Sequence, residues 1–322
     1  MSMSDWQPAS GPGAAARRAR MKQRIRAYFA AAHVLEVDTP VLSPYAVSDP
    51  QIESLEITRC QVSGRPLYLH TSPEFCMKRL LAADYPDIYS MCRVFRDGES
   101  GRLHQPEFTM LEWYRLGMRL DEIVADTVGV VSAALDREID VDTVDYRDAF
   151  IAACGLDPFV TDIASLADAA EADDALRAAV GDERDDWLDL VLATRVTPQF
   201  APDHLTVLRH YPASQAALAR LCPDDNRVAD RFEVFLGPVE LANGYVELTD
   251  SEEQLRRIEA DNIARQRRGR PVRPVDELLL AALESGLPDC AGVALGLERL
   301  LMLFNKTDDI GNVITFTFQA DR

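Results

Sequence analysis

Runs of apolar residues along the chain mark its ordered elements. Five short segments rich in β-branched and aromatic residues are expected to be strands, at 66–71, 88–96, 107–115, 232–236 and 239–248. A longer apolar run at 293–304 predicts a buried helix. Several strand segments follow one another without a helix between them, so we expect an antiparallel or mixed sheet with helices packed beside it. The pattern indicates an α+β fold.

The periodicity of an amphipathic helix runs through a basic segment near the N-terminus. Residues 17–26 contain six basic side chains and no acidic one. Apolar residues recur at helical spacing, at Ile25, Tyr28, Phe29 and Ala32. A second basic stretch covers residues 265–273. Each stretch is interpreted as a solvated helix face, with a partner-binding surface as the alternative.

The negative charge of the chain is concentrated in one segment. The 322 residues carry a formal net charge of −19, and in residues 136–189 the 17 acidic and 4 basic side chains contribute −13 of it. Alanine and leucine are frequent there, so we expect solvated amphipathic helices. A hydrophobic content of 47% excludes wholesale disorder. Residues 1–16 are expected to be a flexible N-terminal arm.

The spacing of the cysteines and the length of the apolar runs indicate the cellular compartment of the protein. The six cysteines stand singly, at positions 60, 76, 92, 154, 222 and 290. They are interpreted as reduced thiols, because neither a disulfide framework nor a zinc site has this spacing. No apolar run reaches the ~18–20 residues of a membrane span, and no signal peptide opens the chain. We therefore expect a cytoplasmic protein that does not bind membranes.

Glu112 is the polar residue that fits its predicted surroundings least. Strand alternation places it between Met110 and Tyr114 on a face that should be dry. A buried carboxylate is costly unless it meets a cation. That cation is either an arginine, which would make a structural salt bridge, or the ammonium group of a ligand.

Two further segments combine charged residues with turn-forming ones. The loop 96–106 joins two apolar strands, and Arg96 at its start and Phe108 just beyond its end can clamp a phosphate and stack a base. Further on, Glu240 and Glu247 flank an Asn-Gly pair. This segment is either a bulged strand that aims oxygen ligands at Mg²⁺ or a hairpin turn with solvated acids. The glycine patterns of common nucleotide-binding loops are missing.

Taken together, these segments resemble the signature of the class II aminoacyl-tRNA synthetases. In that class, motif 1 lies at the dimer interface and motifs 2 and 3 bind ATP. Considered alone, residues 292–299 fit a core helix that follows two glycines and exposes one arginine. The likeness rests on three ordered motifs, Val37-Asp-Thr-Pro40 for motif 1, Phe95-Arg96 to Pro106-Glu-Phe108 for motif 2, and Gly292 to Arg299 for motif 3.

Within the class, the segments Thr71–Glu74 and Glu240–Glu247 are most similar to lysyl-tRNA synthetases. Motif 1 begins at Val37, so we expect no anticodon-binding domain and a single catalytic domain over residues 17–322. That size resembles the elongation factor P–(R)-β-lysine ligases, truncated paralogues of lysyl-tRNA synthetase. The resemblance implies that elongation factor P is the protein substrate, that the chain forms a homodimer through motif 1, and that tRNA is not bound.

The resemblance also implies roles for single residues. Arg96 and Arg299 are the expected catalytic residues, because they would hold the α- and γ-phosphates of ATP while the substrate carboxylate attacks. Mg²⁺ is the expected metal, bound by Glu240 and Glu247. The remaining ATP-binding residues are Asp97, Gly98, Glu99, His104, Phe108, Leu241 and Gly296, with Glu240 shared with the metal. The expected substrate-binding residues are Ser72, Pro73, Glu74, Glu112, Tyr114, Asn243, Glu247 and Ala294.

The chain departs from the family pattern at a few positions. Gly98 stands where lysyl-tRNA synthetases have a glutamate that binds the adenine amino group, so Glu99 or the backbone is expected to make that contact. Gln105 replaces an asparagine. Ala294 replaces a glycine of motif 3, and its methyl group is expected to favour β-lysine over α-lysine by only ~1–3 kcal/mol.

Two other functions remain as alternatives. A non-catalytic regulatory paralogue would keep the ligand pocket, and the altered sequence after Arg96 is the feature that favours it. A minimal synthetase that charges tRNA with lysine is disfavoured by the missing anticodon-binding domain and, less strongly, by the net charge of −19.

Overall fold

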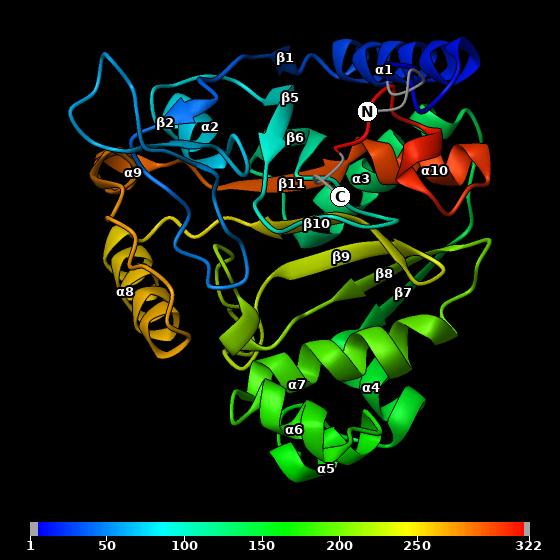
Figure 1. The fold of residues 1–322 in the computed structure, drawn as a ribbon, viewed down its shortest axis with the longest axis vertical. Helices are drawn as coiled ribbons and strands as arrows, with labels where there is room; N and C mark the ends of the chain where they lie inside the picture. Colours follow the sequence, from blue (N-terminus) through cyan, green and yellow to red (C-terminus); the bar gives the residue numbers. More distant parts are fainter. Residues whose placement is uncertain (1–5, 319–322) are drawn as a thin grey trace. The chain divides into compact units, whose positions relative to one another are not determined.

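The computed structural model describes residues 6–318, and the chain forms two compact units (Figure 1). The first unit runs to Gly117 and also takes Val128–Arg137 and the chain from Thr249 onward. The second unit takes Met118–Thr127 and Glu138–Leu248. Helix α3 (Leu120–Leu135) carries the chain from the second unit back into the first.

The first unit is built on a mixed sheet. Strand β1 pairs in parallel with β5, whereas β5 with β6 and β6 with β11 are antiparallel. These strands, in spatial order, are β1 (Leu35–Glu36), β5 (Ile88–Phe95), β6 (Glu107–Leu116) and β11 (Cys290–Gly296). A small antiparallel sheet lies beside them, in the order β2 (Leu42–Ser43), β4 (Leu67–Leu69) and β3 (Glu56–Ile57).

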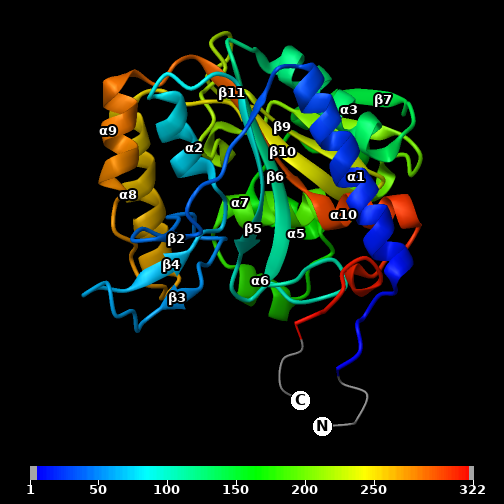
Figure 2. The ribbon, with the colours of Figure 1, turned by 90° about the horizontal axis from the view of Figure 1, so that it is seen from above.

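Helices flank these strands on two sides. Figure 2 shows α2, α8 and α9 gathered at one side of β5 and β6, and α1 with α10 at the other. Asp250 and Asp276 begin α8 and α9, because each carboxylate accepts hydrogen bonds from backbone N–H groups of the first turn. The bounds are α1 (Pro12–Ala31), α2 (Glu74–Leu81), α8 (Ser251–Arg267), α9 (Glu277–Gly286) and α10 (Leu297–Asn305).

The second unit combines its own strands with the acidic helical segment. Strands β10, β9 and β8 are antiparallel, and β7 pairs in parallel with β8. Trp187 and Phe150 are almost fully buried in the core between the helices and β8. The strands are β10 (Val239–Val246), β9 (Arg231–Leu236), β8 (Leu205–Arg209) and β7 (Val141–Asp145), and the helices are α4 (Tyr146–Cys154), α5 (Ile163–Ala169), α6 (Asp174–Val180) and α7 (Arg184–Val191).

The α+β fold class and all five predicted strands are confirmed by the structure. The helix predicted over 293–304 is wrong in its first part, because β11 extends to Gly296 and α10 begins only at Leu297. The run 290–296 is apolar at nearly every position because it lies between other elements, and such a short buried run has no periodicity to distinguish a strand from a helix.

Other expectations have mixed outcomes. Residues 12–16, which we placed in the flexible arm, form the start of α1, where Pro12 occupies the first helical position; residues 1–5 lie outside the described part of the chain. The acidic segment does contain helices, and the six cysteines are free thiols. Among the described residues, no helix has the length and apolar character needed to cross a membrane.

The basic stretch 265–273 does not form one exposed surface. Arg265 is fully buried and Arg273 is 5% exposed. Glu53 holds both guanidinium groups, with Arg265 Nη2 2.7 Å from its Oε2 and Arg273 in contact with its Oε1. These two arginines attach α8 and the segment after it to the loop that carries Glu53, so they are structural and are not available to a partner.

Replacing Glu53 with Gln should destabilise the protein, because two buried guanidinium groups would lose their shared carboxylate. We expect a loss of about 3 kcal/mol in the free energy of unfolding, measured by urea denaturation. Glu56→Gln is the matched control, because Glu56 lies 3.8 Å from Arg273 and its side chain is 38% exposed; it should cost less than about 1 kcal/mol. Equal losses in the two variants would contradict this assignment.

Candidate active site

Glu112 lies in the middle of the first unit's sheet and is 2% exposed. Its register partners are Ser90 on β5 and Ala294 on β11. Its carboxylate accepts two hydrogen bonds, from Ser72 Oγ at 2.7 Å and from the Tyr114 hydroxyl at 2.7 Å. The backbone hydrogen bonds of three strands therefore fix where this buried carboxylate lies, and two hydroxyl groups orient it.

Ser72 connects this carboxylate to the start of α2. Its Oγ accepts a hydrogen bond from the Glu74 backbone N–H at 2.9 Å while donating to Glu112. Pro73 precedes the first turn of α2, which begins at Glu74. The sequence-predicted residues Ser72, Glu74, Glu112 and Tyr114 are thus brought together by one short chain of hydrogen bonds.

Lys78 is a buried cation that the sequence analysis did not single out. It is 1% exposed, and its Nζ lies 2.7 Å from Glu74 Oε1, one helical turn earlier. Its signal in the sequence is the four-residue spacing between a glutamate and a lysine on one helix. Within residues 6–318, no arginine forms an ion pair with Glu112, so the structural salt bridge considered for Glu112 is not what the structure shows.

The electrostatic state of Glu112 follows from this arrangement. Burial raises the pKa of Glu112 well above its usual range, and the negative charge of Glu74 raises it further. The hydrogen bonds from Ser72 and Tyr114 and the charge of Lys78 act in the opposite direction without cancelling the burial. An added ammonium group beside this carboxylate would favour its ionised form, so the site is chemically suited to a second amine.

The residues matched to motif 2 lie where β5 turns back into β6. The Arg96 backbone N–H donates to the Pro106 carbonyl at 2.9 Å, and this hydrogen bond joins the two ends of the loop. The Arg96 guanidinium lies over the Phe108 ring at 5.2 Å and 3.5 Å from Glu99 Oε1. Gly98 has a φ of +78°, a conformation that favours glycine and accounts for its place in this turn.

Arg299 joins the motif 3 helix to the same loop. It lies in the first turn of α10, which begins directly after Gly296, and its Nη2 is 2.6 Å from His104 Nε2. Because arginine only donates, His104 Nε2 must accept and is therefore unprotonated. The structure brings Arg96, Phe108 and Glu99 together, and it brings Arg299 to His104. Asp97 is exposed in the same loop.

The other predicted residues lie on β10 or directly after it, in the second unit. This strand runs without a break through Asn243 and Gly244, so the hairpin turn considered there is not formed. Its pairing with β9 shifts between Glu240 and Ala242, which places the expected bulge at Leu241. Leu241 and Glu247 are each 2% exposed. Glu240, Leu241 and Asn243 thus belong to one strand, and Glu247 directly follows its last residue, Val246.

Glu233 on β9 is a candidate functional residue that the sequence analysis missed. It is the register partner of Asn243, and Arg231 Nη2 donates to its Oε1 at 2.7 Å. Arg231 Nε also donates to Asn243 Oδ1 at 3.2 Å. Burial raises the pKa of Glu233, Arg231 opposes this shift, and Glu240 adds to it. The alternation of charged residues 231 and 233 with apolar neighbours was the available signal.

The raised pKa of Glu112 predicts a specific pH dependence of stability. The folded protein binds this proton more tightly than the unfolded chain does, so the wild type loses stability as pH rises from about 4.3 to the raised pKa. Glu112→Gln lacks this loss, and its free energy of unfolding relative to the wild type should increase across that window. Urea unfolding at a series of pH values measures the difference. Glu107→Gln, on the same strand with a side chain 52% exposed, is the control and should show no such trend.

Comparison with known proteins places the chain in a family. The model for tRNA synthetases of class II (D, K and N) matches residues 14–320. A Photorhabdus laumondii protein named elongation factor P--(R)-beta-lysine ligase is 42% identical over 318 residues, 98% of each chain. Proteins of the same name from Sodalis glossinidius and Edwardsiella ictaluri are each 43% identical over 98% of this chain and 99% and 98% of their own. The chain belongs to the class II tRNA synthetase family.

Proposed function

We propose that this protein is an ATP-dependent ligase that activates (R)-β-lysine as an adenylate and transfers it to a lysine side chain of elongation factor P. The observation that carries the proposal is the buried carboxylate of Glu112, held by Ser72 and Tyr114 without an arginine partner in residues 6–318. It suits the side-chain ammonium of a lysine isomer. The names of relatives that are 42–43% identical across nearly the whole chain support the choice of acceptor.

In the first half-reaction, the substrate carboxylate attacks the α-phosphorus of ATP, and the bond from that phosphorus to the bridging oxygen breaks to release pyrophosphate. Arg96 would neutralise the charge that develops on the α-phosphate, and Arg299 would hold the γ-phosphate. Phe108 would stack on adenine once Arg96 turns from its ring to the phosphate. His104, Asp97, Gly98, Glu99, Leu241 and Gly296 would complete the nucleotide contacts.

The substrate amines would be distinguished by the two carboxylates of the first unit. Glu112 and Tyr114 would bind the side-chain ammonium. The carboxylate of Glu74 would bind the second amino group of the substrate while it keeps its ion pair with Lys78. Pro73 and Ser72 set the start of α2 that presents Glu74. On the family resemblance we assign Asn243 to the substrate carboxylate and Glu247 to an ammonium group.

Ala294 is the residue that we assign to isomer selection. It is the register partner of Glu112 on β11, so its methyl group adjoins the position of the buried carboxylate in the sheet. A methyl group there would disfavour the α-amine of α-lysine and leave room for the shifted amine of β-lysine. Such steric selection amounts to ~1–3 kcal/mol.

In the second half-reaction, a deprotonated lysine amine of the acceptor attacks the adenylate carbonyl. A carbon–nitrogen bond forms, the bond from the carbonyl carbon to the phosphate oxygen breaks, and AMP leaves.

We further propose that the enzyme acts as a homodimer through the motif 1 segment 37–40, in the cytoplasm and without binding tRNA. The backbone N–H of Val37 donates to the Tyr89 carbonyl at 2.8 Å, which attaches this segment to β5.

We also propose that acidic residues of the second unit hold a magnesium ion. Burial raises the pKa of Glu233 and the charge of Glu240 raises it further, while Arg231, which donates to Glu233 Oε1 at 2.7 Å, lowers it. Oxygen-only ligands of this kind suit Mg²⁺. We therefore propose Glu240 as a ligand, with Glu247 from the family pattern and Glu233 from the structure as its partners. The ion would supply charge neutralisation for the phosphates of ATP.

The proposed activity is tested by incubating elongation factor P with the protein, ATP and either (R)-β-lysine or α-lysine. Mass spectrometry should show addition of one lysyl group, faster with (R)-β-lysine.

Arg96→Ala should reduce the rate of ATP–pyrophosphate exchange at least a hundredfold, which corresponds to an activation barrier higher by about 2.7 kcal/mol or more. The unfolding midpoint of this variant should stay within a few degrees of the wild type. Arg102→Ala, an exposed arginine of the same loop, is the control. Exchange with α-lysine alone and transfer to tRNA would contradict the proposal, and no exchange with either isomer would favour a non-catalytic role.

The metal assignment predicts which acids control the magnesium requirement. Glu240→Gln and Glu233→Gln should each raise the Mg²⁺ concentration for half-maximal pyrophosphate exchange at least tenfold, because each removes a charged oxygen ligand. Asp224→Asn, which neutralises an exposed acid of the same unit, should leave it unchanged. An unchanged requirement in Glu233→Gln together with a raised one in Glu247→Gln would remove Glu233 from the ligand set.

A further inference from the structure

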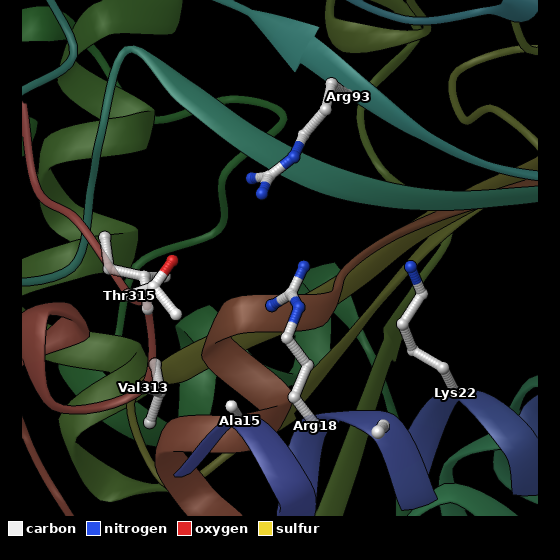
Figure 3. Close-up of a pocket in the computed structure, with 8 residues that line it drawn as sticks. Ala15, Arg18, Lys22, Arg93, Val313 and Thr315 are labelled. Carbon is white, nitrogen blue, oxygen red and sulfur yellow. The ribbon is translucent and has the colours of Figure 1, made fainter. Parts of the chain in front are cut away.

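The basic face of α1 borders a cavity of about 200 Å³ in the first unit. Figure 3 shows Arg18 and Lys22 rising from α1 and Arg93 extending from β5 toward the same space, with Val313 and Thr315 along one side. Three cationic side chains from two elements therefore converge on one small volume. The lining is completed by Ala15, Ala19 and Ile314.

A single buried carboxylate orients the two guanidinium groups. Glu298 is 2% exposed, and its Oε1 lies 2.9 Å from Arg18 Nη1 and 3.8 Å from Arg93 Nη1. Its Oε2 accepts the Thr109 backbone N–H at 2.9 Å, and Arg18 Nη2 donates to the Thr109 hydroxyl. Arg93 Nε also lies 3.4 Å from Glu107 Oε1. The arginines are therefore held in place before any ligand arrives.

Lys22 is the cation of the cavity that no acid among the described residues contacts directly, and Glu298 and Glu36 act on it only from a distance. Its Nζ makes neither a hydrogen bond nor an ion pair with any residue between 6 and 318. Burial lowers the pKa of Lys22, and the charges of Arg18, Arg26 and Arg93 lower it further, against the weaker pull of Glu298. Glu298 and Glu107 pair with the two arginines, so the ammonium group of Lys22 is the cation of this cavity that has no ion pair with the described residues.

We propose that this cavity binds a small phosphate-class oxyanion, with Arg18, Lys22 and Arg93 as its ligands. Guanidinium groups match the paired oxygens of a phosphate, and an ammonium group adds a compact third charge. A volume of about 200 Å³ admits a phosphate group but lies below the ~300–1,000 Å³ of pockets for larger ligands. The site differs from the ATP residues proposed above and does not rest on the proposed function.

Phosphate titration of the full-length protein by calorimetry tests the proposal. Lys22→Met should weaken the affinity for inorganic phosphate at least tenfold, and Lys22→Arg should retain it. Arg20→Met, which removes an equal charge from an exposed position of the same helix, should bind phosphate as the wild type does. Arg96→Ala should also retain this binding, because Arg96 belongs to the proposed ATP site.

Acetate at the same ionic strength distinguishes a phosphate site from general attraction to anions. We expect acetate to bind at least tenfold more weakly than phosphate, because it offers a single charge and two oxygens. Equal binding of phosphate and acetate would overturn the assignment to phosphate. Phosphate affinity that is unchanged in Lys22→Met, or lost equally in Arg20→Met, would overturn the site.

Discussion

The burial of a carboxylate within a β-sheet is the constraint on which the candidate site of the first unit depends. Glu112 lies on the middle strand of three, so backbone hydrogen bonds to β5 and β11 fix its position. Ser72 and Tyr114 supply two hydroxyl donors, which lower the cost of burial without removing it. A ligand that brings its own ammonium group would remove the remaining cost, so the feature that costs stability would supply affinity for the lysine-like substrate that we propose.

Shared carboxylates position cations elsewhere in the same unit. Glu298 holds Arg18 and Arg93 at one side of the sheet, and Glu53 holds Arg265 and Arg273 at the other. In each case one acid contacts two guanidinium groups, and a second, more exposed acid lies near one of them, Glu107 beside Arg93 and Glu56 beside Arg273. At the cavity beside α1, Lys22 adds a third cation that forms no ion pair with residues 6–318, and this is the physical basis for expecting an anion there.

Much of the fold could be predicted from the sequence because local pattern and structure agree. Short apolar runs located β5, β6, β9 and β10. The contrast between the charge of Glu112 and its apolar neighbours indicated that this carboxylate needs a cation, from either an arginine or a ligand. The helix prediction over 293–304 failed in its first part, because a short apolar run is compatible with both a buried strand and a buried helix. The run that contains Ala294 is apolar at nearly every position, and only its pairing with β6 makes it a strand.

The sequence by itself determined the fold class, the order of the three motifs and the identity of most candidate residues, because these depend on neighbours within a few positions. Only the tertiary structure decided the partners of the charged groups. Arg18 meets Glu298 from 280 positions away and Arg265 meets Glu53 across 212, and no periodicity links such pairs. Lys78 beside Glu74 and Glu233 beside Asn243 became candidates only through geometry, because burial and proximity decide whether a charge is solvated, paired or available to a ligand.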